Sequence, residues 1–249
     1  MFEIEFFEKA YQLFTSNFNL FWYGIKITLL LAFLGTLFGL IIGLMLGGIR
    51  AISIEPRDSA FIKCIKRICH TIVGIYIWFF RGTPMMVQAM FLYYALRPAL
   101  GWSALTAGII IISVNTGAYM AEIIRSGIQA IDKGQIEAAR SIGMSSVQAM
   151  MYIVLPQAIK NSFPSIGNEF IVNIKDSSML NVIGVIEVFF QSRSVAGSAM
   201  LYSETFFITC LIYLVLTTIT TQILRLIEKK MNMAKTSFPT SQTVPNILN

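Results

Sequence analysis

The sequence has little charge for its length. Only 13% of its 249 residues are Asp, Glu, Lys or Arg, whereas a soluble domain usually carries about 25%. Hydrophobic residues make up 55% of the chain, and the mean hydropathy is +0.68. This composition excludes a protein whose main solvent is water and indicates an integral membrane protein. The net charge of +6 does not indicate nucleic acid binding, because Lys and Arg collect on the cytoplasmic side of a membrane.

Histidine, cysteine and nucleotide-binding motifs are also scarce or missing. His70 is the only histidine, and Cys64, Cys69 and Cys210 have a spacing that fits no metal site. The apolar segments therefore offer neither a nucleophile–base pair nor a set of metal ligands, which disfavours a membrane-embedded enzyme. No GxxxxGK[ST] phosphate-binding loop is present. We expect no cofactor on this chain, and any ATP that drives the protein must bind to another subunit.

Long apolar runs take the place of charge. A helix needs about 20 mostly apolar residues to cross about 30 Å of hydrocarbon, which predicts an all-α membrane protein with about five transmembrane helices. The segments, two of them with a polar interruption, are 21–49, 71–96, 102–124, 163–190 and 205–227. Residues 1–20 then form an N-terminal extracytoplasmic segment, residues 21–232 the transmembrane domain, and residues 233–249 a polar tail whose composition is typical of disorder.

The basic residues between the apolar segments predict the orientation of the chain. Loops rich in Lys and Arg stay in the cytoplasm, and with an odd number of spans this places the N-terminus outside and the C-terminus inside. On the other side lie only Lys9, Arg97 and Arg193. The basic residues assigned to the cytoplasmic side are Arg50, Arg57, Lys63, Lys66, Arg67, Arg125, Lys133, Arg140, Lys160, Arg225, Lys229, Lys230 and Lys235.

The loop at about 132–160 has helix signals of its own. Asp132 and Ser145 can each cap a short helix, and each is followed three residues later by a glutamine, as in a capping box. Gly143 can end the first helix because glycine adopts a left-handed conformation without steric cost, and Pro156 marks the end of the second. The loop is predicted to form two short helices joined at a glycine.

The same loop has an apolar surface despite its predicted place in the cytoplasm. Small side chains leave a shallow surface, and larger ones add an adaptable apolar one. Such a knob suits a groove on a partner protein, although an amphipathic helix lying on the membrane is an open alternative. The residues concerned are Ala138, Ala139, Ile142, Met144, Val147, Met150 and Met151.

The amino-acid sequence of the loop favours a surface that binds a partner protein. The stretch EAARSIGMSSVQAMMYIVLP resembles the EAA loop of ABC importer permeases, in which Glu-Ala-Ala is followed by three residues, Gly, nine residues and Ile-x-Leu-Pro. Two further stretches, FFRGTPMMVQAMFLYY and NIKDSSMLNVIGVIEV, resemble the polar amino acid branch of these permeases. The matching residues of the loop are Glu137, Ala138, Ala139, Gly143, Ile153, Leu155 and Pro156.

The resemblance implies a type I ABC importer permease fold in the cytoplasmic membrane of a prokaryote. The subunit would pair with a second permease subunit, identical or related, and would receive an amino acid from an extracytoplasmic substrate-binding protein. An ATP-binding cassette ATPase on the cytoplasmic side would bind ATP and Mg. The resemblance also implies that the loop couples to this ATPase, through Glu137, Ala138, Ala139, Gly143, Met144 and Ser145.

Polar residues inside the apolar segments are candidates for a substrate path, because charge in hydrocarbon is costly. In the fourth segment an unwound turn at 175–178 would direct charges and hydroxyls into a cavity, as in broken transporter helices. A zwitterionic substrate needs groups of both signs. The candidates are Lys175, Asp176, Ser177 and Ser178, with Arg81 and Thr83 from the second segment and Asn115, Tyr119 and Glu122 from the third.

Three of these assignments have structural alternatives. Arg81 could extend to the cytoplasmic interface. Lys175 and Asp176 could hold the break in the fourth segment, and Glu122 could pair with Arg125 three residues later.

Glycine recurs every fourth residue in the first apolar segment, at Gly35, Gly39, Gly43 and Gly47. Small residues at this spacing let two helix backbones approach closely. We interpret the ridge as a helix-packing surface, within the subunit or across a dimer.

Together these features favour an ABC importer permease that moves a polar or charged amino acid by alternating access and catalyses no covalent chemistry itself. The alternative is a secondary carrier that couples transport to protons or sodium through the charged turn. Such a carrier needs no partner ATPase, and it leaves the 132–160 loop unexplained.

Overall fold

The computed structural model describes residues 2–52, 54, 56 and 58–233. Regular structure in these ranges is helical, with no strand, which confirms the predicted all-α class. The predicted tail lies outside the described residues except for Met233, as do Arg57 and Lys235. The elements are α1 (Phe2–Ser16), α2 (Phe18–Ala51), α3 (Ala60–Gly82), α4 (Met85–Leu100), α5 (Ala104–Gln129), α6 (Lys133–Ser141), α7 (Ser146–Ala149), η1 (Met150–Val154), α8 (Leu155–Asp176), η2 (Ser177–Ile183), α9 (Val188–Ala199) and α10 (Tyr202–Met233).

Among the described helices, α2 and α5 share the most extensive contact. The four glycines of the ridge on α2 lie against α5 of the same subunit. A Cβ atom added at Gly39 would come within 2.7 Å of Thr116 Cγ2, and one at Gly47 would come within 2.8 Å of Ala121 O. Since no larger residue fits at this spacing, the ridge brings the two backbones together.

Three of the described helices are long and apolar enough to cross a membrane, namely α2, α5 and α10. A fourth span results if the chain from Ser146 to Ile183 and helix α9, which meet at an angle of 57°, are taken as one broken span. The second predicted segment, 71–96, is divided at Thr83–Pro84 into α3 and α4. Thr83 is extended (φ −126°, ψ 149°) because a residue before proline disfavours the helical conformation.

A buried carboxylate fixes the bend before α9. Gly184 ends η2 with φ +87°, a conformation that glycine adopts without steric cost. Glu187 is fully buried and caps α9, since its carboxylate accepts hydrogen bonds from the Phe189 and Phe190 amides at 2.8 and 2.7 Å. The Tyr213 hydroxyl of α10 donates to the same carboxylate at 2.8 Å. The break in the fourth segment is therefore held by contacts to two other parts of the bundle.

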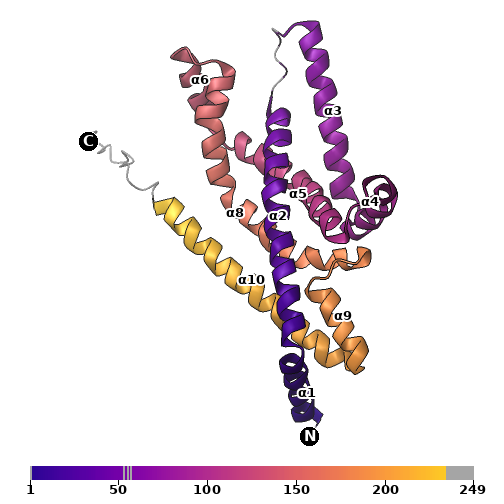
Figure 1. Cartoon of the computed structure of the whole chain (residues 1–249). Helices are drawn as coiled ribbons and strands as arrows, with labels where there is room; N and C mark the ends of the chain where they lie inside the picture. Colours follow the sequence, from indigo (N-terminus) through magenta and orange to yellow (C-terminus); the bar gives the residue numbers. More distant parts are fainter. Residues whose placement is uncertain (1, 53, 55, 57, 234–249) are drawn as a thin grey trace, which may run out of the picture.

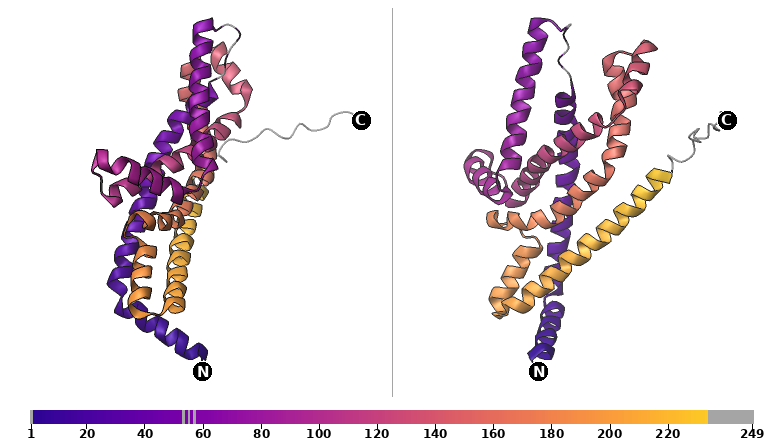
Figure 2. Two further views of the ribbon diagram at one scale, coloured as in Figure 1. Left: turned by 90° about the vertical axis from the view of Figure 1, so that its right-hand side faces the viewer. Right: turned by 180° about the vertical axis from the view of Figure 1, so that it is seen from behind.

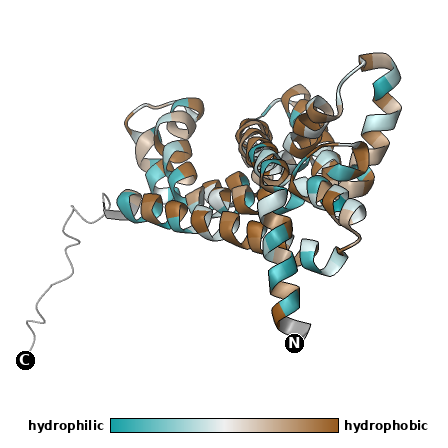
Figure 3. Cartoon of the chain, turned by 60° about the horizontal axis from the view of Figure 1, so that its bottom comes forward, coloured by the Kyte–Doolittle hydropathy of each residue, from teal (hydrophilic) through white to brown (hydrophobic). Residues whose placement is uncertain are grey.

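The two ends of the molecule differ in composition and in what they carry. α1 and α9 lie at one end, and α6 and the start of α3 lie at the other (Figure 1). Two further views show the same elongated arrangement (Figure 2). Apolar residues colour the long helices, whereas turns of α1 and the C-terminal end of α10 are hydrophilic (Figure 3). Two of the segments assigned to the cytoplasm from their basic residues, at the starts of α3 and α6, thus share one end of the bundle.

Candidate functional site: a charged cluster in the spans and a helical loop

Arg81 lies at the end of α3, beside the break, and faces α5. Its guanidinium carbon is 5.4 Å from the centre of the Tyr119 ring, which is within the range of a cation–π contact. Arg81 is exposed in the single subunit, and Tyr119 is partly buried. The structure thus brings together two of the predicted substrate residues, from the second and third apolar segments.

One carboxylate of α8, that of Glu169, lies near this arginine. Glu169 interacts electrostatically with both Arg81 and Asp176. Glu169 and Asp176 are seven residues apart, or about two turns, so they lie on one face of the helix. We refer to Arg81, Tyr119, Glu169 and Asp176 as the span cluster, which combines one cation with two anions.

Sequence analysis missed Glu169. An acidic residue inside the apolar segment 163–190 was the available signal, as for the Lys175–Asp176 pair nearby. Only the packing of both α3 and α8 against α5 relates Glu169 to Arg81. The seven-residue spacing to Asp176 could have indicated a shared helix face.

A polar contact among three helices fixes the position of α8. The buried Asn173 side chain donates to Thr36 Oγ1 of α2 at 2.9 Å and accepts from Thr116 Oγ1 of α5 at 3.0 Å. Asn173 lies between Glu169 and Asp176 in the sequence. This contact therefore fixes where the Glu169 and Asp176 carboxylates lie along the length of α5.

The prediction of an unwound turn at 175–178 was wrong. α8 continues to Asp176, and a 3-10 helix follows from Ser177 to Ile183. The hydroxyls of Ser177 and Ser178 donate to the carbonyls of Ile174 and Lys175 at 2.8 and 2.7 Å, so they close the end of α8. These bonds satisfy two of the last carbonyls of α8, and the break lies after Gly184 instead. Lys175 is exposed, whereas Ser177 is fully buried.

Thr83 and Asn115 belong to a hydrogen-bond network around the α3–α4 break. Asn115 is buried and donates to the Gln88 side chain at 2.9 Å. The Thr83 hydroxyl accepts from the same glutamine at 2.7 Å and donates to Phe79 O at 2.8 Å. Both residues lie next to the span cluster, but their polar atoms already have protein partners.

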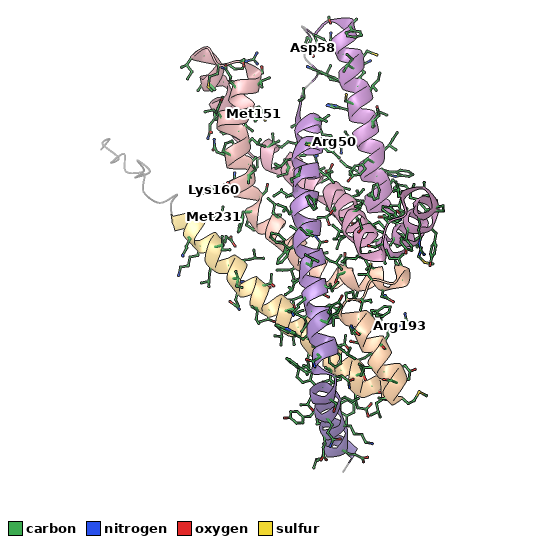
Figure 4. The ribbon with its side chains drawn as sticks, viewed as in Figure 1. Arg50, Asp58, Met151, Lys160, Arg193 and Met231 are labelled. Atoms are coloured by element: carbon green, nitrogen blue, oxygen red, sulfur yellow. The ribbon has the colours of Figure 1, made fainter. Side chains whose placement is uncertain are left out.

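Glu122 is engaged by two arginines at one end of the bundle. Arg50 of α2 contacts its carboxylate at 2.6 Å, and Arg125 contacts it at 2.8 Å. The pairing with Arg125 agrees with the alternative drawn from sequence, while Arg50 lies 72 residues away and could not be inferred. The Arg50 side chain in the upper part of the bundle can be followed in Figure 4.

The 132–160 loop forms short helices at that same end. Asp132 caps α6 by accepting from the Gly134 amide at 2.6 Å, but the predicted capping box with Gln135 is not formed, because the Gln135 side chain accepts from Gln157 at 2.7 Å instead. Ser145 caps α7 in a reciprocal capping box with Gln148. Gly143 joins the two helices with φ +89°. The two caps and the turn are local, so their residues could be read from sequence spacing.

One part of the loop prediction was wrong. No helix ends at Pro156: a π-helical turn, η1, connects α7 directly to α8, and Pro156 lies in the first turn of α8. Proline is tolerated there because the first amides of a helix have no intrahelical acceptor. The loop is therefore a rigid extension of a membrane helix.

Apolar side chains project from the loop into solvent. Ile142 is 81% exposed and Tyr152 is 73% exposed, and Val147 and Met151 are also exposed. Met151 lies at the same end as Asp58, far from Arg193 (Figure 4). Among the predicted coupling residues, Ala138 is exposed but Ala139 is 4% exposed, so Ala139 does not contribute to the surface as expected. The remaining ones are Glu137, Gly143 and Ser145, which are exposed, and Met144, which is half-buried.

Comparison with known proteins identifies relatives over most of the chain. Residues 59–233 match the family described as "Binding-protein-dependent transport system inner membrane component". Over 213 residues the chain is 37% identical to the probable amino-acid permease protein YxeN of Bacillus subtilis strain 168, with 84% of this chain and 90% of that protein covered. It is 34% identical over 213 residues to the glutamine transport system permease protein GlnP of Escherichia coli K12, with 84% and 92% covered.

Solved structures have the same fold. An amino acid ABC transporter crystallised with histidines superposes with a TM-score of 0.75 at 38% identity, covering 87% of this chain and 96% of that one. The MetNI methionine ABC transporter in an inward-facing conformation gives a TM-score of 0.68 at 20% identity, which shows the fold alone. These relatives give no support to an ion-coupled secondary carrier. The chain belongs to the binding-protein-dependent transport system inner membrane component family and is a permease subunit of an ABC importer for polar amino acids.

Proposed function

We propose that this subunit moves a polar or charged amino acid across the membrane by alternating access, with the span cluster as its substrate contact. The observation that carries the proposal is that Glu169 interacts electrostatically with both Arg81 and Asp176, while Arg81 lies over the Tyr119 ring of α5. Ionisable groups at membrane depth are costly and occur mainly where they serve a path or a site. A zwitterion matches such a cluster because its carboxylate can meet the cation and its ammonium group can meet an anion.

Each member of the cluster has a distinct role in this proposal. Arg81 binds the substrate carboxylate, since a guanidinium can donate two parallel hydrogen bonds to it. Asp176 accepts from the α-ammonium group. Glu169 receives the polar or cationic side chain of the substrate, and Tyr119 holds the guanidinium in place. Lys175, Ser177 and Ser178 shape the end of α8 around this contact, with Thr83 and Asn115 supporting the opposite wall.

The test of this role is the substitution Asp176→Asn, which keeps the shape of the side chain and removes its charge. A charge-assisted hydrogen bond is worth about 1.5–3 kcal/mol, which corresponds to a loss of affinity of roughly 10- to 150-fold. Uptake into vesicles should fall at low substrate concentration and recover in part at high concentration.

An unchanged half-saturating concentration would contradict the substrate contact. A lower maximal rate at every concentration, together with a lower melting temperature, would assign Asp176 to the architecture of α8 instead. Both quantities are measured on the same preparation.

The remaining partners follow from the family. The subunit pairs with a second permease, identical or related, and receives substrate from an extracytoplasmic binding protein. An ATPase subunit binds ATP and Mg and engages the exposed apolar surface of the 132–160 loop, with Glu137, Gly143 and Ser145 at the contact and Ala139 behind it. The complex lies in the cytoplasmic membrane of a prokaryote.

The membrane topology in this proposal has five spans, the α3–α4 pair included, with the N-terminus outside and the C-terminus inside. The distribution of basic residues supports it, because the starts of α3 and α6 share one end of the bundle. Purification in mild detergent tests the assembly. An ATPase subunit should copurify in equal amount, and its absence would contradict the proposed contact between the 132–160 loop and an ATPase.

A further inference from the structure

One buried amide closes the break between α3 and α4. Gln88 lies in the first turn of α4 and is 2% exposed. Its Nε2 is 3.0 Å from Phe80 O and 2.9 Å from Thr83 O. In a continuous helix the Phe80 carbonyl would accept from the amide of residue 84, but Pro84 has no N–H to donate. The Gln88 side chain supplies the donor that the proline lacks.

The same amide connects the break to α5. Asn115 Nδ2 donates to Gln88 Oε1 at 2.9 Å and approaches Phe80 O at 3.3 Å. Phe80 precedes Arg81 in the chain, and Asn115 precedes Tyr119 by one helical turn, on the same face. The network therefore ties the end of α3, which carries Arg81, to α5, which carries Tyr119.

We propose that Gln88 is a positioning residue for substrate recognition, which holds Arg81 over Tyr119 through Phe80 and Asn115. This inference rests on the proposed role of Arg81 in binding the substrate carboxylate. Gln88 itself is buried and contacts no substrate. Bidentate recognition of a carboxylate depends on orientation, so a shift of the helix end weakens binding even when the charge is retained.

The competing role is a purely structural one, in which Gln88 only stabilises the break. Both roles predict a lower melting temperature when the amide is removed, so stability alone does not separate them. The two roles predict different combined effects when both Gln88 and Arg81 are substituted. A residue that acts through Arg81 has nothing left to position once the guanidinium is removed, whereas independent effects on two sites add.

The experiment is a double-mutant cycle of Gln88→Met and Arg81→Gln in vesicles that contain the complete transporter. Methionine approximates the shape of glutamine without its amide. The half-saturating concentration is measured for uptake of labelled L-glutamine, L-histidine and L-arginine. Gln88→Met should raise it by up to about 100-fold, because a misplacement of about 1 Å can cost that much. In the Arg81→Gln background the same substitution should cause no further rise.

A matched control is Gln191→Met, since Gln191 is another buried glutamine, on α9, and has no contact with the network. This variant should keep the half-saturating concentration of the unmodified protein. If Gln88→Met does not insert into the membrane, Asn115→Asp replaces it in the cycle. This change keeps the volume and removes the donor to Gln88 Oε1, and the same lack of additivity is expected.

The outcomes distinguish this inference from the function on which it rests. If Arg81→Gln leaves the half-saturating concentration unchanged, the substrate role of Arg81 fails and the positioning role fails with it. Suppose instead that Arg81→Gln raises the half-saturating concentration, and that Gln88→Met raises it by the same factor in the Arg81→Gln background as in the unmodified protein. Only the positioning role is then overturned. A Gln88→Met variant with unchanged uptake has the same consequence.

Discussion

At the scale of single residues, the bundle depends on positions where a side chain is absent as much as on those where one is present. The glycines of α2 face Ile112, Thr116, Met120 and Ile124 of α5 across distances that leave no room for a Cβ atom. Lipid tails are as apolar as the helices themselves, so close van der Waals packing is a main source of association between the spans. The ridge thus acts within the subunit, which resolves one of the two possibilities left open by its spacing.

A pair of glycine substitutions in α2 tests this packing. Gly39→Ala would place a methyl group 2.7 and 2.8 Å from Thr116 Cγ2 and Cβ, whereas no heavy atom lies within 4 Å of the corresponding position at Gly48. Both changes have the same intrinsic effect on helix formation. Overpacking costs about 1–3 kcal/mol, so Gly39→Ala should lower the melting temperature in detergent, and Gly48→Ala should not. Equal melting temperatures would show that α2 and α5 are less tightly packed than described.

At the scale of elements, two short connections determine how the long helices are linked and oriented. The first is the 132–160 loop, in which Gly143 turns the chain between α6 and α7. Because η1 runs without a break into α8, a displacement of the loop moves the helix that carries Glu169 and Asp176. This continuity provides a mechanical path from an ATPase to the span cluster.

Gly143→Leu tests that path. A leucine at φ +89° is strained, because a left-handed conformation brings its Cβ too close to the backbone. The turn should open and shift the exposed apolar surface of the loop. Transport and substrate-stimulated ATP hydrolysis should fall together by at least about tenfold, if the lost docking contact is worth about 1.4 kcal/mol or more. The amount of subunit in the membrane serves as the control, and normal stimulation in this variant would exclude a coupling role for the loop.

The second connection is the bend before α9. Glu187→Ala would remove the cap of α9, at a cost of about 0.5–2 kcal/mol, and would remove the carboxylate to which the half-buried Tyr213 hydroxyl donates. We expect a clear fall in the melting temperature of the purified subunit. Glu8→Ala, on the exposed surface of α1, should leave it unchanged. A Glu187→Ala variant as stable as the Glu8→Ala control would mean that the bend is held by packing alone.

At the scale of the whole molecule, the two ends of the bundle carry different elements. The 132–160 loop lies at one end, and α9 with Arg193 lies towards the other (Figure 4). The span cluster lies between them, on the helices that connect the ends. This arrangement is what a permease requires if ATP hydrolysis on one side is to change access to a site from the other.

Cysteine labelling tests the orientation in the membrane. In a variant whose Cys64, Cys69 and Cys210 are replaced by serine, single cysteines are placed at the exposed positions Ser146 and Ser194. An impermeant thiol reagent should label position 146 only in inside-out vesicles and position 194 only from the outer face. The reverse pattern would overturn the charge-based topology and remove the loop from the reach of a cytoplasmic ATPase.

The sequence by itself determined the class of the protein and the local structure of its loop. Apolar runs of span length require helices, because a membrane offers no hydrogen bonds to a bare backbone. Asp132, Gly143 and Ser145 could be read correctly because a cap or a turn involves residues only two to four positions apart. The resemblance of that loop to a known motif then indicated the family.

Only the tertiary structure decided which polar residues meet. Arg50 reaches Glu122 across 72 positions of sequence, and Asn115 bonds to Gln88 across 27. The electrostatic interaction of Arg81 with Glu169 likewise depends on the packing of separate helices. Spacing along the chain carries no information on such contacts, because helix rotation and register are set by packing of the whole bundle. For the same reason the sequence placed the helix break at residues 175–178, whereas contacts from Tyr213 and the cap at Glu187 place it after Gly184.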